Sequence, residues 1–114
     1  MLKIVPASLV VAASLLTAAC SDTAPACSDT ETVDLVLEIA RDSLLEQAGA
    51  EIANKVEMSL NAIRTTDANE TTGAFECAAE LEFTGPGGSN SIDITYLSEL
   101  VDSGDEFYVT VWGL

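Results

Sequence analysis

The sequence predicts an α+β fold in which one N-terminal helix packs on a four-stranded antiparallel β-meander, after a signal peptide. Three observations predict this arrangement. The chain opens with a short apolar run, and one stretch with helical periodicity follows. Then come three segments in which apolar and polar residues alternate and a final β-rich run, separated by turn residues. A length of 114 residues suits one small domain. We therefore expect a signal peptide over 1–19, a tether over 20–26 and a single domain over 27–114.

The N-terminal run is nearly all apolar from Ile4 to Ala19, and Lys3 precedes it. A positive start followed by a short apolar core is typical of a secretory signal peptide. The run is shorter than the ~20 residues that a membrane-spanning helix needs. Export is therefore the expectation, with a transmembrane anchor as the alternative.

The end of this run carries a recognisable motif. Small residues, Thr17 to Ala19, lead directly into Cys20, and Leu16 precedes them. This resembles the lipobox of bacterial prolipoproteins, although Thr17 stands where that family has Leu. The resemblance implies cleavage before Cys20, acyl chains such as palmitate on Cys20, and a place in the cell envelope facing the periplasm. Ser21 after the cysteine implies the outer membrane. The alternative is ordinary cleavage after Ala19 or Ala26, which would release a soluble secreted or periplasmic protein.

The three cysteines, Cys20, Cys27 and Cys77, form an odd count, which is awkward in an exported protein because one thiol is left over. If Cys20 carries lipid, Cys27 and Cys77 can pair in an oxidising compartment. Such a disulfide closes a loop of about 50 residues, which is worth about 4 kcal/mol in the chain-entropy model. The alternative is a free, buried Cys77.

The helix is expected to begin at Ser28, because Ser28 and Glu31 have the spacing of a capping box, and to end or kink at Gly49. Its core-facing stripe is predicted to contain Val33, Val36, Leu37, Ala40 and Leu44. Leu35 and Ile39 lie roughly opposite this stripe. Either the segment 50–54 folds back over them, or they form an exposed apolar strip and a candidate partner surface.

Four strands are expected at 56–62, 75–83, 92–97 and 107–112. The turns between them are expected at 66–73, 85–90 and 102–105. Ile63 breaks the alternation, which indicates a bulge. Cys77 falls on the apolar face of its strand, so a bridge to Cys27 would pin the helix start to the sheet. The arrangement is loosely similar to cystatin-like α+β folds, a likeness of architecture that carries no functional residue across.

Composition excludes several functions. The chain has no His, which removes the commonest general base and His-ligated metal sites. Four basic residues are too few to bind a nucleic-acid backbone. The acidic residues after the third predicted strand lack the spacing of an EF-hand loop. Outward carboxylates on a flat sheet face lack the cleft that acid–base catalysis needs. We expect no enzyme activity, no cofactor and no metal; the carboxylates considered were Glu76, Glu80, Glu82, Asp93, Glu99, Asp102, Asp105 and Glu106.

Charge and aromatic residues point to binding. Without Lys3, three basic residues remain against 19 acidic ones, a net charge of −16 that would steer a basic envelope protein to this surface. The same acidity also suits a saline habitat. Tyr108 and Trp112 face outward as a partner surface if Phe107 faces the helix; the opposite register buries Trp112. We expect a non-catalytic envelope binding protein, a class that includes inhibitors and immunity-type proteins. The alternatives are a structural lipoprotein without a ligand and a secreted inhibitor.

Overall fold

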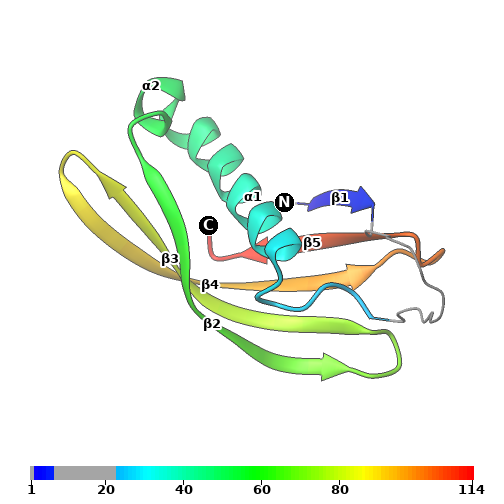
Figure 1. Ribbon diagram of the computed structural model, residues 1–114. Helices are drawn as coiled ribbons and strands as arrows, with labels where there is room; N and C mark the ends of the chain where they lie inside the picture. The colour runs from blue at the N-terminus through cyan, green and yellow to red at the C-terminus, as the bar shows by residue number, and fades with distance from the viewer. Residues whose placement is uncertain (1, 7–22) are drawn as a thin grey trace.

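The computed structural model describes residues 2–6 and 23–114 (Figure 1). All strands within these residues pair antiparallel in one five-stranded sheet of order β1-β5-β4-β3-β2. The helix α1 lies over one face of the sheet, and the sequential strands β2 to β5 form the predicted meander, so the α+β class is confirmed. The elements are β1 (Leu2–Pro6), α1 (Thr30–Ala48), α2 (Ala50–Ala53), β2 (Glu57–Asn69), β3 (Ala74–Gly85), β4 (Gly88–Leu100) and β5 (Glu106–Trp112).

The strand β1 was not expected. It pairs with β5 from Leu2 opposite Thr110 to Pro6 opposite Glu106. With residues 2–6 in place, the last strand of the meander is therefore not an edge of the sheet. An open edge offers unpaired backbone groups, and a short apolar segment can satisfy them whatever its role in export. The signal peptide over 1–19 stays a prediction, since residues 7–19 and Cys20 lie outside the described residues.

The core-facing side of α1 is rotated from the predicted stripe. Val36 and Ala40 are buried as expected, but Leu35 and Ile39 are buried with them, at 3% and 0% exposure. The prediction of an exposed strip at Leu35 and Ile39 is therefore wrong. Two polar residues, Thr32 and Ser43, lie on the buried side of α1. Because they interrupt the apolar residues on that side, the helical spacing of the buried positions was not visible in the sequence. The buried stripe is Thr32, Leu35, Val36, Ile39, Ala40 and Ser43, whereas Val33, Leu37 and Leu44 are half-buried.

Both ends of α1 have a local cause. The helix is capped by Asp29 rather than Ser28, and the expected capping box does not form: the Asp29 side chain makes no cap bond and accepts a hydrogen bond from the Ala26 N–H at 2.9 Å. Gly49 ends the helix with φ 89°, a left-handed conformation that favours glycine. The short helix α2 then turns the chain toward β2.

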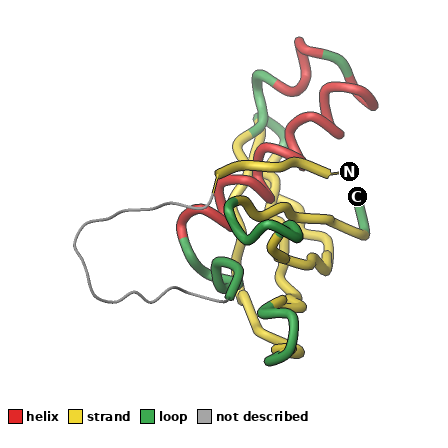
Figure 2. Tube along the Cα trace, turned by 90° about the vertical axis from the view of Figure 1, so that its right-hand side faces the viewer, coloured by secondary structure: helices red, strands yellow, loops and turns green. Residues whose placement is uncertain are grey.

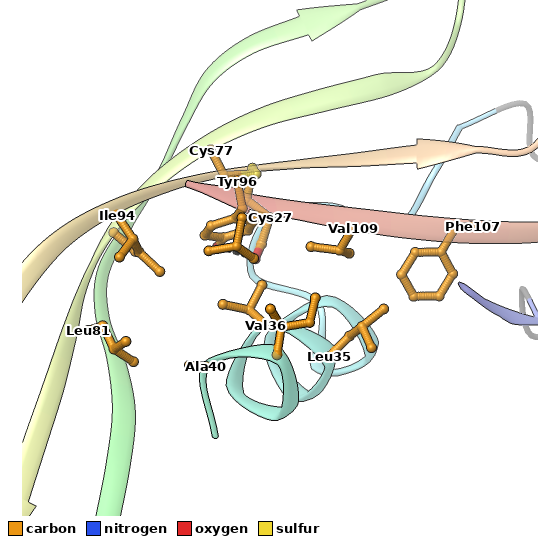
Figure 3. Close-up of a cluster of buried hydrophobic side chains, with 13 residues drawn as sticks. Cys27, Leu35, Val36, Ala40, Cys77, Leu81, Ile94, Tyr96, Phe107 and Val109 are labelled. Carbon is orange, nitrogen blue, oxygen red and sulfur yellow. Dashed lines mark hydrogen bonds between the residues drawn. A yellow bond between two sulfur atoms is a disulfide. The ribbon is translucent and has the colours of Figure 1, made fainter. Parts of the chain in front are cut away.

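The core lies between α1 and the sheet (Figure 3). The predicted alternation is confirmed in β3, which buries Cys77, Ala79 and Leu81, and in β4, which buries Ile94, Tyr96 and Ser98. The strand β5 buries Phe107, Val109 and Val111 in the same way. Figure 3 shows Leu35 and Val36 on the side of α1 that faces β5 and β4. Fully buried sheet residues include Cys77, Ala79, Leu81, Ile94, Tyr96, Phe107 and Val109.

The bulge expected near Ile63 is confirmed by a register shift between Asn61 and Arg64. Two turns are shorter than expected. The strand β2 continues to Asn69 with a second shift, and Gly85 pairs directly with Gly88 across a two-residue turn. Polar residues there still pair through the backbone, which needs no apolar side chain.

Candidate partner-binding surface

The disulfide Cys27–Cys77 is present, with a Cα–Cα distance of 5.7 Å and a sequence separation of 50 residues. It joins the segment before α1 to the buried face of β3. Both cysteines are at most 2% exposed. This bond uses both cysteines among residues 2–6 and 23–114, and Cys20 lies outside those residues.

The segment before Cys27 is packed on the sheet. Ala24 is 3% exposed, and its N–H donates to the Gly73 carbonyl at 2.9 Å. The Ser98 hydroxyl donates to the Pro25 carbonyl, also at 2.9 Å. The residues assigned to a tether therefore lie in the folded domain from Ala24 onward.

This end of the sheet is acidic. A cleft of about 750 Å³ is lined by Glu70 from the β2–β3 turn, by Glu99 and Asp102 around the end of β4, and by Tyr108 of β5. A hydrogen bond to Glu99 raises the pKa of Tyr108 above 10.0, with smaller effects from burial and from the charges of Glu99 and Asp102. The hydroxyl therefore stays protonated beside the carboxylate. The cleft suits basic or hydrogen-bond-donating groups.

The outer face of the sheet carries Trp112, which is 52% exposed. Phe107 and Val109 are buried against α1, so the outward register of Tyr108 and Trp112 is the one the structure has. A hollow of about 360 Å³ contains Trp112 with Arg64 and Asp93. The bulge in β2 places Arg64 beside this hollow. Sequence periodicity alone does not predict Arg64 as a neighbour of Trp112.

Tyr108 and Trp112 do not form one spot. They lie four positions apart on β5, a distance of about 13 Å along the strand, with Tyr108 in the acidic cleft and Trp112 in the hollow near Arg64. Leu35 and Ile39 lie in the core behind both. Of the four residues predicted for a partner surface, the structure leaves two accessible, on separate parts of the outer face.

The carboxylates on the outer face of β3 are exposed to solvent or hydrogen-bonded to neighbouring polar side chains. Glu76 and Glu80 are exposed, whereas Glu82 accepts hydrogen bonds from Asn61 at 3.2 Å and Ser59 at 3.4 Å. In the part of the chain that the structure describes, no three Cys, Asp or Glu side chains gather as ligands for a metal ion.

Comparisons with protein-family models, with curated proteins and with solved structures give no match for this chain. Among residues 2–6 and 23–114, no helix has both the length and the apolarity to cross a membrane. The fold and surface define a small, acidic, disulfide-bonded α+β domain.

Proposed function

We propose that this protein is a lipid-anchored, non-catalytic binding protein of the bacterial cell envelope whose acidic domain binds a basic macromolecular partner. The observation that carries the proposal is the Cys27–Cys77 disulfide. It uses the two cysteines outside the lipobox-like motif and leaves Cys20 for the lipid. A structural disulfide also suits the oxidising periplasm rather than the cytosol.

The packing of Ala24 on the β2–β3 turn supports an anchoring role for Cys20. The lipid would sit within about 14 Å of the folded domain, at its acidic end. This short link holds the domain at the membrane surface, on the periplasmic side of the outer membrane. Its acidic end does not itself dock on anionic lipid, because like charges repel.

Charge supports the binding role. The chain from Cys20 onward carries 19 acidic residues against Arg41, Lys55 and Arg64. A negative electrostatic field raises the association rate of a basic protein. Added salt screens the field, so the association rate falls as the salt concentration rises. The acidic cleft at Glu99 and Asp102 concentrates that charge next to a hydrogen-bonding tyrosine.

The test of anchoring is intact mass spectrometry on protein purified from membranes of a bacterial host. We expect a chain that starts at Cys20, carries acyl groups, and gains the mass of two protons on reduction. The Cys20→Ser variant is the control and should lack the lipid while keeping the disulfide. An unlipidated chain that starts after Ala19 or Ala26 would contradict the anchoring.

The binding role has its own test. Association of the purified domain with a basic envelope-acting protein, such as a lysozyme-type enzyme, should be fast at low salt and slow at high salt. The Glu99→Gln/Asp102→Asn variant should bind more slowly than Glu80→Gln/Asp93→Asn, which removes the same charge from the outer face. Equal association rates for the two variants would show that the acidic cleft is not the binding site. The absence of binding at low salt would favour a structural lipoprotein.

A further inference from the structure

The two lateral strands of the meander differ in how they are protected. The strand β2 has two register shifts, a positive φ at Ala62, and charged residues at Glu57, Arg64 and Asp67. Bulges and charges are the devices by which natural sheets prevent pairing at an edge. Its outer side therefore discourages a further strand.

Apart from Glu106 at its start, the strand β5 has none of these devices. From Phe107 to Trp112 it carries no charge and no proline, and its pairing with β4 runs from Leu100 opposite Phe107 to Thr95 opposite Trp112 without a shift. A flat, uncharged edge of aromatic and β-branched residues is a template for another strand. In the structure, residues 2–6 pair with that template.

The strand that uses it is β1. It pairs along β5 over five positions and also contacts α1, so it lies beside both elements (Figure 1, Figure 2). Phe107 and Leu35 point into the space between α1 and β5 (Figure 3) and are buried with β1 in place. Every residue of β1 belongs to the segment that the sequence predicts to be removed on export.

From this juxtaposition we propose that β5 is a strand-accepting edge: β1 covers it before processing, and removal of residues 1–19 opens it to an extended segment of a basic partner protein. The inference rests on the proposed function, since it assumes processing before Cys20. The incoming segment would run antiparallel to β5, as β1 does. Main-chain hydrogen bonds would supply affinity, and side chains opposite Phe107 and Val109 would face α1.

Charge defines the partner and disfavours a second copy. The carboxyl end of β1 lies opposite Glu106, and Asp102 and Asp105 are in the adjoining turn. An incoming strand therefore meets acidic residues just beyond its own carboxyl end, where Lys or Arg would be favoured. Two processed copies, each of net charge −16, would repel one another. The occupant is thus an apolar extended segment followed by basic residues.

The experiment uses the processed, lipidated protein in detergent and a synthetic probe, acetyl-Leu-Lys-Ile-Val-Lys-Lys-amide. Hydrogen exchange with residue resolution should show that the probe slows exchange in β5, at 107–111, by about tenfold or more, and leaves β2 unchanged. The reordered peptide Lys-Lys-Leu-Lys-Ile-Val has the same composition but puts its basic end away from Glu106. It should bind several-fold more weakly at low salt.

Two controls separate strand addition from charge attraction. N-methylation of alternate residues of the probe blocks the hydrogen bonds on one edge of the strand it forms. Methylation of the residues whose N–H groups face β5 should abolish the protection of β5. Methylation of the other set, whose N–H groups face solvent, should leave the protection unchanged. The Asp105→Asn/Glu106→Gln variant should bind the probe several-fold more weakly, whereas the charge-matched Glu57→Gln/Asp67→Asn variant on β2 should bind it as the unmodified protein does.

Several results would overturn the inference. A processed chain in which the probe leaves β5 exchange unchanged refutes strand addition while the lipid anchor stands. A processed dimer with β5 already protected makes the occupant a second copy, and a monomer with β5 already protected shows that the edge never opens. A purified chain that retains residues 1–19 is identified by its mass, and it contradicts the anchoring together with the inference.

Discussion

The Tyr96 hydroxyl donates a 2.8 Å hydrogen bond to the main-chain carbonyl of Cys27, 69 residues earlier in the chain. The bond is buried beside the disulfide to Cys77, so a hydrogen bond and a covalent bond hold the same point of the pre-helix segment (Figure 3). Ser98, next along the inner face of β4, holds Pro25 in the same way. The helix start is thereby fixed to the two central strands of the meander.

Alkaline pH should weaken this attachment. Burial raises the pKa of Tyr96 from 10.0 to about 12. Below pH 10 the residue is protonated in both states; between pH 10 and 12 the unfolded chain loses a proton that the native chain keeps. The free energy of unfolding should therefore fall over that interval, by up to about 2 kcal/mol. Urea titrations across this range measure it.

The matched variants are Tyr96→Phe and Tyr108→Phe. Tyr96→Phe should lose about 1–2 kcal/mol at neutral pH, because a buried carbonyl loses its donor, and should show a shallower alkaline decline. Tyr108 lies at the surface, so its substitution should change stability little. An unchanged alkaline decline in Tyr96→Phe would assign the pH dependence to other groups.

Removal of the disulfide by Cys27→Ala/Cys77→Ala should lower the free energy of unfolding by roughly 2–4 kcal/mol, because the unfolded chain regains the freedom of a 50-residue loop. Chemical denaturation of the variant and of the reduced parent measures the effect. Equal midpoints for oxidised and reduced protein would contradict a stabilising role.

Arg41 should matter more than its place on a helix flank indicates. Its Nη1 and Nη2 donate to the carbonyls of Ala53 and Val56, each at 2.8 Å, and so hold α2 and the start of β2. Arg41→Ala should cost about 1–3 kcal/mol, and Arg41→Lys should recover part of that, since one ammonium cannot serve both carbonyls in the same geometry. Faster hydrogen exchange at 53–58 should accompany the loss.

Faster hydrogen exchange confined to residues 53–58 distinguishes a local role of Arg41 from general destabilisation. If exchange accelerates equally in β4 and β5, Arg41 does not act through the two carbonyls. Lys55→Ala is the control, because Lys55 is exposed and the substitution removes the same charge from the same corner of the fold.

Thr32 offers a stabilising substitution. It is fully buried, and its Oγ1 has no hydrogen-bond partner among the residues that the structure describes. Valine has nearly the same shape and no hydroxyl to desolvate, so Thr32→Val should raise the thermal midpoint, with a gain of up to about 1 kcal/mol. A lower midpoint would mean that the hydroxyl has a partner in solution.

Much of the fold could be predicted because its signals are local. Alternation in 75–83 and 92–97 identified the buried faces of β3 and β4, and the break at Ile63 located a bulge. Cysteine parity predicted the pairing of Cys27 with Cys77. The face of α1 was harder, because Thr32 and Ser43 are buried polar residues and hydropathy cannot distinguish them from exposed ones.

The candidate surface could be predicted only in part. Sequence reasoning left open whether Tyr108 and Trp112 face outward or Trp112 is buried. It also could not predict their neighbours, since Arg64 reaches Trp112 only through a shifted register. For Leu35 and Ile39 the sequence left two alternatives, cover by segment 50–54 or an exposed strip, because their burial depends on the sheet, which is distant in the chain.

The sequence by itself determined the class of fold, the disulfide, the buried faces of β3 and β4 and the acidity, because each follows from residue type and short-range period. Only the tertiary structure decided which side of α1 is buried, that Ala24 belongs to the folded domain, and that β1 covers the edge of β5. Those outcomes depend on contacts between residues up to about a hundred positions apart, where packing and main-chain pairing outweigh local preference.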